Sequence, residues 1–78
     1  MNKSAKKQLS KLYDEIESLR EKLEQIKDQQ QETYDNMSER VQESERGETL
    51  YEALDNLETA HTLIEEALEN IDNAKGET

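Results

Sequence analysis

The sequence predicts an all-α protein, an antiparallel two-helix coiled-coil hairpin that assembles into a four-helix bundle or a higher oligomer. Two stretches of apolar residues recur at alternating spacings of three and four, the pattern of a helix that packs along one side. The 78 residues include no Pro and two Gly, fewer than the turns of a sheet protein require. Hydrophobic residues make up 31% and charged residues 38%, so a single domain with a thin core is expected.

The first helix is predicted from about residue 4 to residue 35. Its apolar seam turns polar beyond Ile26. Asn36 or Ser38 can cap a short turn that follows, which favours an end near Asp35 over a continuation to Glu43. The seam comprises Leu9, Leu12, Ile16, Leu19, Leu23, Ile26, Gln30, Thr33 and Met37.

The connection is expected over about residues 36–48, and Gly47 suits the left-handed position that follows a helix. Thr49 precedes Glu52 by three residues, which is the spacing of a capping box at a helix start. A second helix is therefore predicted over about residues 50–74. Its seam comprises Leu50, Leu54, Leu57, His61, Ile64, Leu68, Ile71 and Lys75.

Folding the two seams together about this turn gives facing residue numbers that sum to roughly 91. Leu54 then faces Met37. In the same register His61 faces Gln30, and such a buried polar layer penalises slipped registers at a cost in stability. We expect Gln30 and His61 to form this layer.

The register leaves the start of the first helix without a neighbour, because Lys75 would lie opposite Ile16. A hairpin of this size without large aromatic residues in its seam is also only marginally stable. Self-association into a four-helix bundle, or a protein that docks on the same strip, would cover the exposed residues. These residues, Leu9, Leu12 and Tyr13, are candidates for partner binding.

Small side chains recur at a period of seven in the second helix, each just before a seam position. Two helices approach more closely where one offers only methyl groups, so this period favours close packing. The alternative is that Ala is the best helix former. The residues are Ala53, Ala60, Ala67 and Ala74. Tyr34 and Tyr51 flank the turn and are expected to pack together over it.

The chain is acidic, with 10 Lys and Arg against 20 Asp and Glu, a net charge of −10. A net negative charge disfavours direct binding to nucleic acids and to anionic membranes. Basic residues nevertheless gather at the N-terminus, at Lys3, Lys6, Lys7 and Lys11. An acidic stripe follows on the first helix, and we include it in the partner-binding surface: Asp14, Glu17, Glu21, Glu24 and Asp28.

No catalytic motif is present. The sequence has no Cys and one His, which excludes thiolate zinc sites and cysteine nucleophiles. Glu58 and Glu65 lie at helical spacing from His61, but one imidazole beside surface acids is a weak metal motif. We expect no enzyme activity, no metal and no cofactor. No apolar run approaches the length of a membrane span or of a signal peptide, so a soluble cytoplasmic protein is predicted.

Two segments, QESERGE at 42–48 and EALDNLE at 52–58, resemble small uncharacterised acidic helical-hairpin proteins of phages and mobile elements of Gram-positive bacteria. The resemblance extends from Tyr13 onward. It implies a phage setting, in which small acidic proteins often bind host enzymes or defence proteins. It brings no catalytic residues.

Three functions remain open at this point. The first is a non-enzymatic protein-binding hairpin that self-associates, in the phage setting an inhibitor of a host or defence protein. The second is an acidic mimic of nucleic acid that blocks a DNA- or RNA-processing enzyme. The third is an oligomer that sequesters a small nucleotide-like ligand between protomers, using basic residues such as Arg46.

Overall fold

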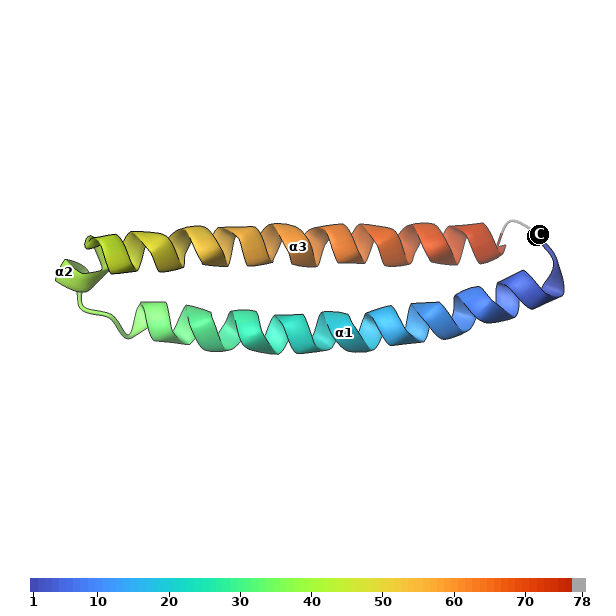
Figure 1. Ribbon diagram of the computed structural model, residues 1–78, viewed down its shortest axis with the longest axis horizontal. Helices are drawn as coiled ribbons and strands as arrows, with labels where there is room; N and C mark the ends of the chain where they lie inside the picture. The colour runs from blue at the N-terminus through green and yellow to red at the C-terminus, as the bar shows by residue number, and fades with distance from the viewer. Residues whose placement is uncertain (77–78) are drawn as a thin grey trace.

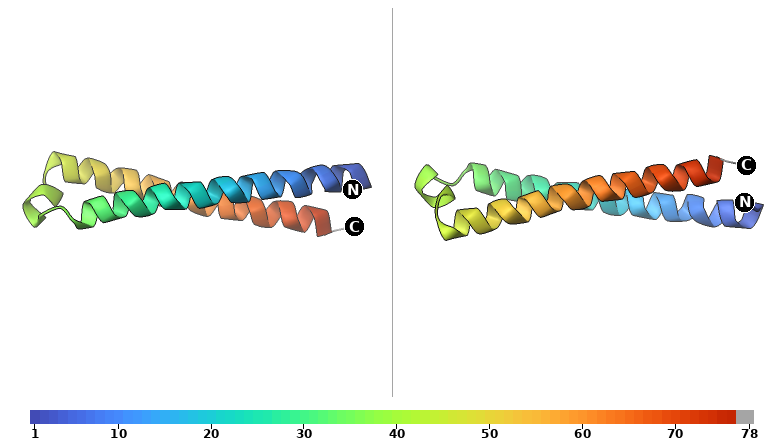
Figure 2. Two further views of the ribbon diagram at one scale, coloured as in Figure 1. Left: turned by 90° about the horizontal axis from the view of Figure 1, so that it is seen from below. Right: turned by 90° about the horizontal axis from the view of Figure 1, so that it is seen from above.

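The computed structural model describes residues 1–76 and contains three helices, α1 (Lys3–Asp35), α2 (Glu39–Gln42) and α3 (Glu45–Gly76). The long helices α1 and α3 lie side by side and antiparallel, with α2 at the end where the chain reverses (Figure 1). They wind around each other with a left hand (Figure 2), as sustained heptad spacing requires. The resulting rod measures 57 × 15 × 13 Å. The prediction of an all-α helical hairpin is confirmed.

Side-chain caps define both ends of α1. The Oδ1 atom of Asn2 accepts a hydrogen bond of 2.8 Å from the Ala5 backbone N–H. At the other end Asn36 is the C-cap, and its N–H donates to the Glu32 carbonyl at 3.0 Å. Ser38 then caps α2 by accepting from the Val41 N–H at 3.3 Å. The predicted end at Asp35, with a short capped turn after it, is confirmed.

Helix α3 begins at Glu45, five residues before the predicted start. The backbone N–H of Gly47 donates to Ser44 Oγ at 3.4 Å, and that of Glu48 donates to the Ser44 carbonyl at 2.9 Å. Ser44 therefore satisfies amide groups in the first turn, as an N-cap residue does. The expectation that Thr49 and Glu52 open the helix is wrong, because a cap was available one turn earlier.

Gly47 lies in the first turn of α3 and is buried. No residue in the described chain, Gly included, has a positive φ, so the expected left-handed role of Gly47 is wrong. A Cβ atom at this position would collide with the carbonyl oxygens of Val41 and Gln42. Gly is needed here because the end of α2 packs directly against the backbone of α3.

The register differs from the prediction. Facing pairs such as Lys27 with Glu58 and Tyr34 with Tyr51 have residue numbers that sum to 85, where about 91 was expected. The reason is the early start of α3, which moves the centre of the connection toward the N-terminus by about three residues. His61 therefore lies near Glu24 instead of Gln30.

The same shift changes the end of the rod where α1 begins. Lys75 contacts Ser10 at 3.4 Å and lies over the Tyr13 ring, where a position opposite Ile16 was expected. Tyr13 is therefore covered by α3, and the expectation that it extends beyond the second helix is wrong. Leu9 is half-buried and Leu12 is 43% exposed.

The structure agrees with the whole predicted seam on α3, but with only part of the predicted seam on α1. Every residue of the α3 seam is buried or half-buried, and Leu54 and Leu68 are the buried core. On α1 only alternate members of the predicted seam face α3, because Leu19 and Ile26 are 58% and 52% exposed. The half-buried positions between residues 9 and 34 of α1 are Leu9, Tyr13, Ile16, Glu17, Arg20, Leu23, Lys27, Gln30 and Tyr34. Tyr13, Arg20, Lys27 and Tyr34 thus replace Leu12, Leu19, Ile26 and Thr33 at the contact.

Candidate protein-interaction surface

The rod has two different sides, and each side has a groove near the turn. One groove is lined by Lys27, Tyr34 and Glu58. The other is lined by Thr33, Leu50 and Ala53. Because residues seven apart share a face of a coiled-coil helix, each set continues along the rod. We call the first the ionic side and the second the apolar side.

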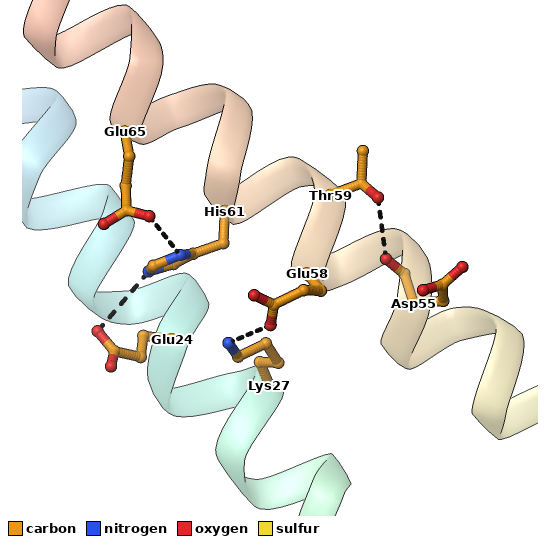
Figure 3. Close-up of polar contacts among 7 residues, drawn as sticks. All are labelled: Glu24, Lys27, Asp55, Glu58, Thr59, His61 and Glu65. Atoms are coloured by element: carbon orange, nitrogen blue, oxygen red, sulfur yellow. Dashed lines mark hydrogen bonds and ion pairs between the residues drawn. The ribbon is translucent and has the colours of Figure 1, made fainter.

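The ionic side is held by a close ion pair between the helices. The Nζ atom of Lys27 on α1 donates to Oε2 of Glu58 on α3 at 2.6 Å (Figure 3). This hydrogen bond raises the pKa of Lys27 above its ordinary value of 10.5 and lowers the pKa of Glu58 below 4.5. Each group thus stabilises the charged form of the other.

His61 occupies the next part of the ionic side. Its ring reaches from α3 toward α1 between two carboxylates (Figure 3). The Nδ1 atom lies 3.3 Å from Glu65, and the Nε2 atom lies 3.8 Å from Glu24. Arg20 adds a contact of 3.6 Å to Glu65. The His61 side chain is only 13% exposed, so a polar group in the α3 seam is enclosed by charged neighbours.

Two polar atoms in this cluster, Arg20 Nε and His61 Nε2, are buried without a hydrogen-bond partner among the described residues. Unpaired buried polar atoms reduce stability, but they also disfavour alternative registers in which the same groups would lie against apolar residues. His61 thus occupies a polar layer as expected, although Glu24 and Glu65 take the place predicted for Gln30.

Aromatic contacts close the ionic side near its ends. The Tyr34 and Tyr51 rings pack with centroids 5.9 Å apart and planes tilted by 53°, which confirms their predicted contact over the turn. At the other end the ammonium group of Lys75 lies 5.0 Å from the centre of the Tyr13 ring, within the range of a cation–π interaction.

The apolar side combines exposed and half-buried residues of both long helices. From α1 it takes Leu12, Leu19, Ile26 and Thr33, and from α3 it takes the heptad alanines Ala53, Ala60, Ala67 and Ala74. Near the turn Thr33 and Ala53 line an open groove of about 620 Å³. Exposed leucine and isoleucine in one line are unusual for a polar chain, and such patches mark protein interaction sites.

Few charges border the apolar side. The residues just outside it on α1 and α3 are all exposed, and only two of the eight are charged. Leu63 is among them and is 58% exposed. Protein interfaces are depleted of charge in the same way. The bordering residues are Gln8, Glu15, Lys22 and Gln29 on α1, with Thr49, Asn56, Leu63 and Asn70 on α3.

The predicted site residues are distributed over both sides. Of the acidic stripe, Asp14, Glu21 and Asp28 are exposed, Glu17 is half-buried and Glu24 lies in the ionic side beside His61. The alanines lie at the edge of the α1–α3 contact and not at its centre: Ala53 and Ala67 are exposed, and Ala60 and Ala74 are half-buried.

Sequence reasoning placed Leu19 and Ile26 in the hairpin core and so missed them as surface residues. A signal for their exposure was present in the sequence. Across both helices only two of the eight positions that border the apolar side are charged, although 38% of the chain is charged. A polar chain with one weakly charged stripe indicates a third contact face in addition to the hairpin seam.

Within residues 1–76 no group of three or more His, Asp or Glu side chains is arranged to hold a metal ion. None of the helices described is both long and apolar enough to cross a membrane. Comparisons with protein-family models, curated proteins and solved structures gave no match to this chain.

Proposed function

We propose that this protein is a non-enzymatic, protein-binding helical hairpin that acts by burying its apolar side against the helices of a protein partner. The observation that carries the proposal is the line of Leu12, Leu19 and Ile26, which are 43%, 58% and 52% exposed. The hairpin covers one side of each helix and leaves this line open to solvent. A partner that covered it would complete the core of a helical bundle.

The energetic gain from such burial is substantial for a small chain. Full burial of one Leu or Ile side chain contributes about 1.5–3 kcal/mol. Leu19 and Ile26 are each more than half exposed, and Leu63 lies at the border of the same side. Within residues 1–76 Leu54 and Leu68 are the only buried hydrophobic residues, so a partner that buries the apolar side would enlarge a small core.

The phage resemblance supports a finer version of the proposal, in which the partner is a host or defence protein that is inhibited on binding. The exposed carboxylates of Asp14, Glu21 and Asp28 on the outer face favour partners with basic surfaces and raise the rate of association.

The same three carboxylates favour a second candidate, the nucleic-acid mimic, because none of them forms an ion pair within residues 1–76. They recur every seven residues, or about 10 Å along the helix axis. Duplex DNA carries about one charge per 1.7 Å of its axis. Since Glu24 lies beside His61, the stripe is also interrupted. We therefore place the protein-binding function first.

Site-specific photo-cross-linking tests the proposed function. A benzoylphenylalanine residue is introduced at position 19 on the apolar side, or at position 21 on the outer acidic face as the matched control. In cells that contain the natural partner, irradiation should yield a cross-linked protein from position 19 and much less from position 21. Mass spectrometry then identifies the linked chain. Equal labelling from both positions, or none from position 19, would contradict the proposal.

A further inference from the structure

We infer that the occupant of the apolar side is a second copy of this chain, lying antiparallel so that the two turns are at opposite ends of a four-helix bundle. This inference rests on the proposed function, because it uses the same surface and specifies the partner. In this arrangement α1 packs on α1 of the second copy, and α3 packs on α3. The area, the charge distribution and the alanine period each support it.

The available area suits a stable dimer. The rod is 57 Å long and 15 Å wide, so one broad side presents on the order of 850 Å². Stable protein interfaces bury about 800 Å² from each partner. The apolar side therefore supplies a full-sized interface when two copies overlap along their whole length, and it supplies much less if they overlap in part.

The charge distribution selects the antiparallel direction. Residues 1–11 contain four Lys and no acid, a net charge of +4, whereas residues 32–52 at the turn end contain seven acids and two Arg, a net charge of −5. Within residues 1–76 none of the four lysines forms an ion pair with its own hairpin. An antiparallel copy brings each lysine-rich end beside a turn end. A parallel copy would bring the two acidic turn ends together, which is unfavourable.

The net charge of −10 does not oppose this contact, because few of the charges lie at it. Of the residues on and bordering the apolar side, only Glu15, Lys22, Glu45 and Arg46 are charged, with two charges of each sign. The remaining acids lie on the ionic side or on the outer faces. They would stay in water when two apolar sides meet, at distances where salt screens their repulsion.

The alanines explain how α3 would meet its copy. Helices with alanine at every seventh position approach to about 8 Å between axes. Full overlap places the twofold axis between Leu19 and Ile26 on α1, and between Ala60 and Ala67 on α3. Leu19 then lies against Ile26 of the second copy, and Ala60 lies against its Ala67. Large residues thus meet large ones on α1, and small residues meet small ones on α3.

The first test is the mass of the wild-type chain in solution, measured by light scattering, together with the dependence of its melting temperature on concentration. We expect twice the chain mass, and a melting temperature that rises with concentration because association stabilises the folded state. The double variant Leu19→Asn, Ile26→Asn should have the mass of a monomer. The control variant Asp14→Asn, Glu21→Asn on the outer face should remain a dimer.

The second test measures orientation with spin labels, for which the chain is suited because it has no native Cys. Ser4 and Glu32 are exposed on α1, and each is changed to Cys and labelled in a separate sample. From the rise of 1.5 Å per residue, the axial separation between copies should be about 55 Å for position 4 and about 28 Å for position 32. In a parallel dimer both separations would be short and nearly equal.

The outcomes separate the two proposals. A wild-type chain with a monomer mass and a melting temperature independent of concentration would overturn the dimer, and equal short distances would overturn its direction. If the dimer fails but cross-linking from position 19 captures a different protein, the proposed function stands with another partner. If cross-linking from position 19 also fails, the proposed function fails as well. Circular dichroism of the Asn variant at high concentration shows whether the monomer folds, and the tests on the wild-type chain do not depend on that result.

Discussion

Lys27 and Glu58 join α1 to α3 through a hydrogen bond of 2.6 Å, the shortest ion pair in the described part of the chain. The residues are 31 positions apart in the sequence, so their contact fixes the register of the two helices. A shift of one heptad would separate them and would also move His61 away from Glu24. The contact therefore provides a direct probe of the hairpin.

Replacing Glu58 by Gln should lower the melting temperature at neutral pH, because it removes the charge that Lys27 pairs with. The lowered pKa of Glu58 means that its contribution is present above pH 4.5 and is lost as the pH falls through the folded-state pKa. The raised pKa of Lys27 means that its contribution is present below pH 10.5 and is lost as the pH rises through its folded-state value.

The difference between wild type and Glu58→Gln should thus be largest between these limits and should disappear in acid. Thermal melts followed by circular dichroism at a fixed protein concentration measure it. The control is Glu66→Gln, which makes the same change in net charge at an exposed residue outside the ion pairs of residues 1–76. Equal effects of the two substitutions at pH 7 would show that the pair contributes nothing specific.

Gly47→Ala should destabilise the hairpin by about 1–3 kcal/mol, the usual cost of forcing an extra carbon into a closely packed site. The new Cβ would collide with the Val41 and Gln42 carbonyls, which belong to backbone and cannot rotate away. Gly76→Ala is the matched control, because a Cβ there meets nothing within 4 Å. Chemical denaturation of both variants gives the comparison. An unchanged stability of Gly47→Ala would refute the tight packing of α2 on α3.

Leu68→Ala should cost about 2–5 kcal/mol, as expected for a buried leucine. Leu68 is 4% exposed and is one of the two buried core residues. Leu63→Ala deletes the same atoms at a residue that is 58% exposed, and it should change the stability of the single hairpin by less than about 0.5 kcal/mol. Similar losses for both variants in denaturant titrations would contradict the assignment of Leu68 to the core.

His61→Leu should raise the stability of the hairpin by about 1 kcal/mol, because buried polar clusters are often less stable than apolar residues of similar volume. The substitution removes one of the two buried nitrogen atoms that lack a partner. His61→Gln keeps a polar group in place and should give no such gain. A melting temperature for His61→Leu below that of wild type would indicate that the contacts to Glu24 and Glu65 outweigh the cost of burial.

The sequence predicted the α3 face better than the α1 face, for a physical reason. On α3 the apolar residues fall on a single seam, so only one face can pack inward. On α1 two solutions share Leu9, Ile16 and Leu23, and they differ in whether Leu19 and Ile26 or Arg20 and Lys27 join them. Hydrophobicity alone favours the solution with Leu19 and Ile26. Arg and Lys instead bury their aliphatic stems while their charged tips reach Glu65 and Glu58.

The candidate surface depends on which residues of α1 face α3, and it was therefore only partly predictable from the sequence. The need for a covering partner was inferred at the sequence level from an overhanging end of α1, whereas the surface runs along the rod and includes Leu19 and Ile26. The position of the turn accounts for the remaining difference, which is the register of the two helices. Ser44 and Thr49 both have the side chain of a helix cap, and nothing local to either residue tells which one the tertiary packing will use.

The short helix α2 has a further consequence for the hairpin. The Gln42 side-chain amide donates to the Tyr34 carbonyl at 2.9 Å and thereby ties α2 to the last turn of α1. Asn36, Ser38 and Ser44 terminate or start helices on either side of it. Straightening the chain into one uninterrupted helix would break the side-chain hydrogen bonds of Ser38, Gln42 and Ser44 and would separate Gly47 from α2. The connection between α1 and α3 thus disfavours domain swapping, in which two molecules exchange a long helix.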